Sequence, residues 1–167
     1  MYRGMMSDSF QPRVTNEMVQ AQKASVLAAG TATVDAWLFA TGCPAPIIVP
    51  VCVGSPDGLS RWDGVDAWAW LAPEFPDHGN PTVWWVMRSA VEGEEMTSPL
   101  VIMSTPPIQS QANLKHARND LISDMYGAVS THWEGNVLIF KVDPGDHRHL
   151  VSVEIADLPN IWACIRR

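Results

Sequence analysis

Apolar side chains in the first third of the chain recur at helical spacing, in two short runs. The members of the first run are Met18, Val19, Val26 and Leu27. Thr15 precedes this run as an N-cap candidate and Gly30 ends it, so a helix is predicted between them. A second short helix is predicted from Thr33, again a cap candidate, to Ala40, and Gly42 closes it.

The middle of the chain has the pattern of several strands. The stretch Ile47–Val53 is rich in β-branched residues, and Pro50 within it predicts a sheet edge or a bulge. Residues 83–87 carry large side chains on both faces, so we expect this strand to be covered on both sides. Residues 100–103 form another predicted strand. The stretch 62–70 alternates loosely, and it is either a strand or a loop with tucked-in aromatic side chains.

The clearest predicted helix is long and amphipathic. Ser110 can cap its start and Gly127 lies near its end. Its apolar stripe consists of Leu114, Ala117, Leu121 and Met125. Away from much of that stripe lie His116, Asp120 and Asp124, which share one face and are residue types that bind metals or transfer protons. A solvated polar face with a favourable His–Asp pair is the simpler interpretation, and we prefer it.

The clearest β-hairpin follows this helix. Its first strand covers residues 136–142, its turn residues 143–146, and its return strand residues 149–155. The side chains expected to pack in the sheet include Leu138, Phe140, Val151 and Val153. Asp157 or Asn160 then begins a terminal helical turn.

The order of these elements indicates an α+β protein with a single domain, residues 14–167. This domain has N-terminal helices, a mainly antiparallel sheet, one long amphipathic helix and a C-terminal β-hairpin. Residues 1–13 are polar and aperiodic, so we predict a flexible arm that cannot bury enough apolar surface to order itself. We expect Tyr2 and Phe10 of this arm to dock against a neighbouring subunit.

Composition favours a binding protein. The 167 residues are 47% hydrophobic and only 17% charged, and they include 8 Trp and 8 Met. Indole and thioether groups are enriched in interface cores, where Lys and Glu are depleted. Most of the tryptophans should fill the core of the domain. Three in the acidic middle of the chain are candidate anchors for a partner protein: Trp62, Trp68 and Trp84.

The acidic balance argues against nucleic acid and anionic membranes as partners. The net charge is −7, and the acidic residues are concentrated between Asp57 and Glu95. A protein that binds phosphates needs a basic face. The cations that could still contact RNA lie near the C-terminus: Lys141, Arg148, Arg166 and Arg167.

The common catalytic and metal-binding motifs are absent from the sequence. Three cysteines occur far apart, without the spacing of metal ligands, so we expect neither zinc nor another cofactor. Cys43 with a histidine could form a nucleophile–base pair, but nothing in the sequence brings the two together. His147 and His149 could hold a metal with His132, although paired surface histidines beside a turn are ordinary. The first residues lack the apolar core of a signal peptide, and we expect a soluble intracellular protein.

The last third of the chain combines three features. Gly135 and Asn136 open a hydrophobic strand that ends near Lys141, a return strand follows at residues 150–155, and Asp157 precedes a terminal apolar segment. This order resembles the domain named for the phytoreovirus segment-seven core protein, which recurs in double-stranded RNA viruses of plants and fungi. The resemblance implies a virion-associated, non-enzymatic protein, and members of that family are described as nucleic-acid-binding core proteins.

Because this chain is acidic, a place on the outside of a capsid suits it better than contact with RNA. The first hypothesis is therefore a surface decoration protein of a fungal double-stranded RNA virus. Its partner would be a viral capsid protein, with self-contacts in a symmetric assembly, and it would occur in the virion and in the cytoplasm of the infected host cell. The alternatives are an RNA-binding core protein and a small metal-dependent hydrolase that uses His116, Asp120, His147 and His149.

Overall fold

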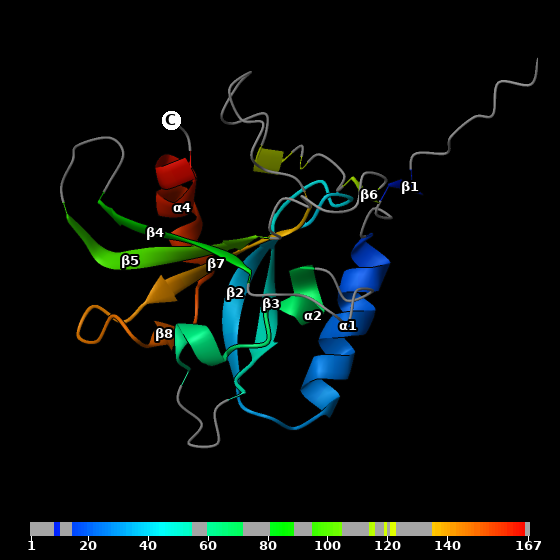
Figure 1. Ribbon diagram of the computed structural model, residues 1–167, viewed down its shortest axis with the longest axis horizontal. Coiled ribbons are helices and arrows are strands. Elements are labelled where there is room, and N and C mark those ends of the chain that lie inside the picture. Colours follow the sequence, from blue (N-terminus) through cyan, green and yellow to red (C-terminus); the bar gives the residue numbers. More distant parts are fainter. Residues whose placement is uncertain are drawn as a thin grey trace, which may run out of the picture.

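Five antiparallel strands form the main sheet of the computed structural model (Figure 1), in the spatial order β3-β2-β7-β5-β4. Their bounds are Thr33–Phe39 for β2, Ile47–Cys52 for β3, Thr82–Arg88 for β4, Glu95–Ser104 for β5 and Val137–Val142 for β7. A short strand, β8 (Leu150–Val151), pairs with the end of β7. Strand β7 therefore lies at the centre of the sheet, between β2 and β5.

Helices and short turns complete the domain. Their bounds are Asn16–Ala28 for α1, Trp68–Leu71 for α2, Leu158–Ile165 for α4, Trp62–Gly64 for the 3-10 turn η1 and Ile155–Asp157 for the 3-10 turn η3. A separate parallel pair joins β1 (Ser9–Phe10) to β6 (Leu114–Lys115). The residues that the structure describes are 9–10, 15–54, 60–71, 81–88, 95–104, 114–115, 119, 121–122 and 135–165.

Two hydrophobic layers cover the two faces of the main sheet. Leu38 and Phe140 belong to the first layer, which also contains side chains of α1 and α2. Phe39 and Ile139, their neighbours along the same strands, belong to the second layer, where Ile161 of α4 packs. Successive side chains of a strand point to opposite faces, so the central strands must be apolar at every position. The domain thus has three layers: helix, sheet and helix.

Helix α1 begins and ends where the sequence predicts. The backbone N–H of Met18 donates to Thr15 Oγ1 at 3.3 Å, which is the expected N-cap. Gly30, just beyond the helix, has a φ of 67°, a conformation that glycine adopts without strain. Half of the predicted apolar stripe is wrong, because Met18 is exposed and Leu27 is 57% exposed. The two members that are buried are Val19 and Val26.

The second predicted helix, from Thr33 to Ala40, is wrong, because Thr33–Phe39 form strand β2. Its side chains alternate between the layers, with Leu38 in the first and Trp37 in the second, and both are buried. A strand covered on both faces shows a continuous apolar run, which periodicity alone does not distinguish from a buried helix. Pairing with β3 and β7 decides in favour of the strand.

The two edge strands of the main sheet differ from each other. Strand β3 lies at one edge, as Pro50 predicts. Strand β4 lies at the other edge and confirms the strand predicted at residues 83–87. The expected cover on both sides is wrong, because Trp84 and Trp85 are 51% and 40% exposed. Adjacent residues of one strand face opposite sides, so each face of β4 presents one indole.

The predicted C-terminal hairpin and terminal helix are confirmed. Strand β2 pairs with the first half of β7, and β8 takes its place beside Lys141 and Val142. The return strand is shorter than predicted, since residues beyond β8 leave the ladder. The backbone N–H of Val153 still donates to Asp35 O at 3.1 Å, which holds this segment against β2. Three of the four side chains expected to pack are buried: Leu138, Phe140 and Val153.

The long helix predicted from Ser110 to Gly127 is wrong at Leu114 and Lys115, which form strand β6. Leu121 and Ile122 are helical, and Ile122 is buried in the second layer. Asn119 is buried but not helical, and the remaining positions of the predicted helix lie outside the described residues. The stretch 62–70 is not a strand, because η1 and α2 occupy most of it. Its aromatic side chains do pack in or against the first layer, as the alternative of tucked-in aromatic side chains predicts. The α+β class and the single domain with a mainly antiparallel sheet are confirmed.

Candidate interaction surface

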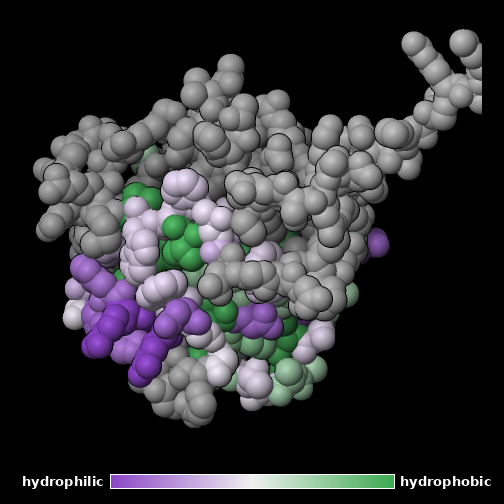
Figure 2. Space-filling view, in the orientation of Figure 1, coloured by the Kyte–Doolittle hydropathy of each residue, from purple (hydrophilic) through white to green (hydrophobic). Residues whose placement is uncertain are grey.

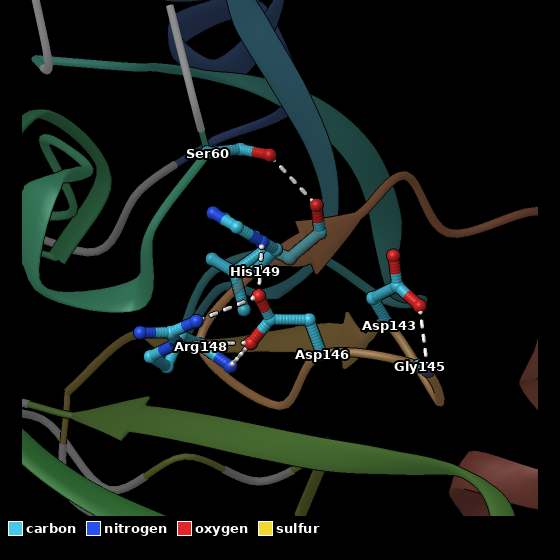
Figure 3. A network of polar contacts seen from close by, with 7 residues as sticks. Ser60, Asp143, Gly145, Asp146, Arg148 and His149 are labelled. Carbon is cyan, nitrogen blue, oxygen red and sulfur yellow. Dashed lines mark hydrogen bonds and ion pairs between the residues drawn. The ribbon is translucent and has the colours of Figure 1, made fainter. Parts of the chain in front are cut away.

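The segment of residues 60–71 is fixed to the sheet by backbone bonds. At one point, Val65 forms a bridge with Val53, directly after β3. At another, the backbone N–H of Leu150 donates to Ser60 O at 2.7 Å, and Ser60 Oγ donates to Leu150 O at 2.7 Å (Figure 3). These bonds tie the segment both to β3 and to β8, so η1 is held in place beside the first hydrophobic layer.

This anchoring brings Trp62 of η1 against Trp85 of β4. The two rings meet edge to face, with their centroids 5.8 Å apart and their planes at 83°. Aromatic pairs favour this geometry. Trp62 is half-buried against the first layer, so it supports the ring of Trp85, which remains 40% exposed.

Trp84 lies on the opposite face of the same strand. Its cross-strand neighbour is Ile102, a member of the second layer, whereas that of Trp85 is Val101, a member of the first layer. We call Trp62, Trp84 and Trp85 the tryptophan edge. It combines large aromatic groups on both faces of one edge strand, which is a composition typical of interface anchors.

The partner-binding residues predicted from the sequence do not all meet here. Trp62 and Trp84 belong to the tryptophan edge, whereas Trp68 begins α2 and packs half-buried against the first layer. Tyr2 lies outside the described residues. Phe10 is in β1, which pairs with β6 of the same chain, and its side chain lies outside the described part. The docking of Tyr2 and Phe10 on a neighbouring subunit stays a prediction.

The loop between β7 and β8 forms the strongly hydrophilic patch at the lower left of Figure 2. Asp146 organises this loop (Figure 3): it accepts from Arg148 Nε at 3.1 Å and Nη2 at 3.2 Å, and it lies 3.1 Å from His149 Nδ1. The side-chain bonds from Arg148, helped by its backbone N–H, lower the pKa of Asp146 to about 2. The same pairing raises the pKa of Arg148. Asp143 Oδ1 accepts from the backbone N–H of Gly145 at 2.8 Å.

Two cations proposed for RNA binding are engaged by carboxylates of this chain. Arg148 makes the forked contact with Asp146, and Lys141 Nζ lies 2.9 Å from Asp157 Oδ2. A phosphate would have to displace a carboxylate of this chain before it could bind either cation. Arg166 and Arg167 lie outside the described residues. Within the described part, the hairpin therefore presents paired charges instead of a basic face.

The proposed hydrolase site gains no support from the described part of the chain. There, no group of three or more histidine, cysteine, aspartate or glutamate side chains could hold a metal ion. His116, Asp120, Asp124 and His132 lie outside the described residues. His147 is exposed and His149 is half-buried. Burial raises the pKa of the Cys43 thiol, which disfavours the reactive thiolate.

Two buried asparagines join the ends of several elements, a role that sequence patterns did not reveal. Asn136 Oδ1 accepts from the backbone N–H of Thr41 at 3.1 Å, and its Nδ2 donates to Trp70 O at 3.0 Å. Asn119 Nδ2 donates to Phe39 O and Gly135 O, both at 2.8 Å. The Gly-Asn dipeptide before β7 was visible in the sequence, but its partners are distant along the chain.

Trp85 is the member of the tryptophan edge that sequence reasoning missed as a surface residue. The available signal was the Trp84–Trp85 pair itself, since two adjacent aromatic residues in an edge strand must occupy both faces. Comparisons of the chain with protein-family models, with curated proteins and with solved structures found no match. Among the described residues, no helix has both the length and the apolar character to cross a membrane.

Proposed function

We propose that this chain is a non-enzymatic structural protein that binds a viral capsid protein on the outside of the shell. The observation that carries the proposal is the tryptophan edge, with Trp84 and Trp85 51% and 40% exposed on adjacent positions of an edge strand. Single exposed apolar residues are normal on a protein surface. Adjacent exposed indoles with a third indole beneath one of them are typical of binding anchors.

Polar groups around these rings support the same interpretation. Asp63 follows Trp62 in η1 and is exposed, so it can belong to the rim that surrounds an apolar interface core. An acidic rim favours a partner whose facing surface is basic or neutral. It disfavours RNA, as does the pairing of Lys141 and Arg148 with carboxylates.

The viral assignment of the partner rests on the sequence. The Gly135–Asn136 opening, the strand that ends near Lys141 and Asp157 before a terminal apolar segment resemble the phytoreovirus core-protein domain. The chain would accordingly belong to the virion and to the cytoplasm of the infected host cell, as a decoration protein of a double-stranded RNA virus. Symmetric shells contain many copies of each protein, so contacts between copies of this chain are part of the proposal.

The test is cosedimentation of the purified chain with virus particles that have been stripped of it. Replacing both exposed indoles, Trp84→Ser with Trp85→Ser, should weaken binding by at least about 30-fold, because a single central aromatic anchor already contributes about 2 kcal/mol or more. Leu27→Ser is the matched control, since Leu27 is also exposed but lies on α1. Equal binding of the double variant and the control would refute the proposed surface.

A further inference from the structure

Residues 82–87 of β4 lack the prolines and charges by which proteins often protect edge strands, and the register shift before Arg88 lies at the end of the strand. Such strands present main-chain N–H and C=O groups that can pair with another chain, and charges, prolines or short length usually prevent this. At the opposite edge of the sheet, β3 carries Pro50 in its middle. Residues 82–87 of β4 contain no proline and no charge. No strand in the described part of the chain pairs with the outer side of β4.

We propose that β4 pairs antiparallel with β4 of a second copy of this chain, around a two-fold axis perpendicular to the sheet. The pairing would join the two sheets into one continuous sheet. It goes beyond the proposed function, because it requires no capsid. Cyclic dimers with a two-fold axis are the commonest oligomers, and an edge strand is self-complementary in the antiparallel orientation.

The two faces of β4 limit the register of this pairing. A two-fold axis perpendicular to the sheet keeps the faces distinct, so Trp84 can face only residues on its own side of the strand. Two registers place an indole at the axis: in one, Trp84 faces its own copy and Trp85 faces Val83, and in the other, Trp85 faces its own copy and Trp84 faces Val86. In both registers aromatic side chains lie opposite aromatic or β-branched ones, which are favourable cross-strand pairs.

The charge of the chain does not oppose pairing at this edge. The net charge of −7 would repel two copies at many orientations. Within β4, however, Arg88 is the single charged residue, and it lies at the end of the strand. In neither register does Arg88 face Arg88 of the second copy. A register shift between Val86 and Arg88 also ends the regular ladder before this residue.

A second copy fits the edge better than an isolated strand of another protein. Val83 packs against the first hydrophobic layer and Val86 against the second, so both layers reach β4. A single added strand would offer side chains but no layers behind them. The second copy brings the same two layers to its own β4, so both layers continue from one sheet into the other.

The test measures self-association of the full chain by analytical ultracentrifugation over a series of concentrations. Wild-type protein should form dimers, and Trp84→Lys or Trp84→Glu alone should weaken dimerisation by about 30-fold or more. Mixing these two variants should restore a heterodimer if Trp84 faces its own copy. In the other register, the mixture of Trp85→Lys and Trp85→Glu should restore it. Leu27→Lys is the control, and circular dichroism verifies that each variant is folded.

Three results would overturn the inference: a wild-type monomer at all concentrations, a dimer that tolerates every β4 substitution, or failure of both mixtures to restore association. The outcome is separable from the proposed function. A dimer without affinity for particles would refute capsid binding alone, whereas a monomer that binds particles would refute β4 pairing alone.

Discussion

Replacing Phe140 with alanine should test how much of the stability resides in the centre of the sheet. Phe140 is 0% exposed in the first hydrophobic layer, and its cross-strand neighbour on β5 is Val101. Strands and helices surround the site, so the cavity cannot collapse freely. Phenylalanine-to-alanine changes at such sites cost about 3–5 kcal/mol. Since a domain of this size has a stability of about 5–15 kcal/mol, this single change removes a large fraction of it.

The assay is urea unfolding followed by circular dichroism. With an m value of about 2 kcal/mol/M, a loss of about 4 kcal/mol lowers the unfolding midpoint by about 2 M. Leu27→Ala serves as the control, because Leu27 is 57% exposed on α1. It should change the free energy of unfolding by no more than about 0.5 kcal/mol. A loss below about 1 kcal/mol for Phe140→Ala would refute the assignment of this residue to the core.

Two further predictions concern the hairpin loop and the N-terminal arm. Pairing with Arg148 lowers the pKa of Asp146 from 3.8 to about 2, so its contribution to stability is present above pH 4 and is lost as the pH falls towards 2. Asp146→Asn should remove this part of the acid dependence in thermal unfolding scans, and an unchanged dependence would contradict it. Deleting residues 1–13 should weaken particle binding in cosedimentation while changing Tm by less than about 4 °C, because β1 adds only a two-residue pair. Unfolding of the isolated truncated chain would contradict this.

Local signals predicted much of the fold. Thr15 and Gly30 mark the ends of α1 by capping and by positive φ, and both act within a few residues of sequence. Pro50 predicts the sheet edge because proline has no backbone N–H to donate to a neighbouring strand. The turn residues in the loop at residues 143–149 predict the hairpin of β7 and β8. These features depend on near neighbours, which the sequence displays directly.

The errors have a different physical origin. Residues 33–39 form a strand buried on both faces, so the period-2 pattern that identifies strands is absent. Leu114 and Lys115 pair with β1, a contact between residues about a hundred positions apart that no local pattern encodes. The exposure of Trp85 depends on β4 being the edge of the sheet, and strand order follows from tertiary packing. For the same reason, the contact between Trp62 and Trp85 could not be predicted.

The ratio of this chain to capsid protein in gradient-purified virus particles decides whether it is a decoration protein. A decoration protein should be present at a fixed ratio across the particle peak, and it should be removed by protease while the genome inside stays protected. Stripped particles should rebind the wild-type chain to the same ratio, but not the variant that lacks Trp84 and Trp85. Absence of the chain from particles, or a ratio that varies from fraction to fraction, would contradict the proposed function.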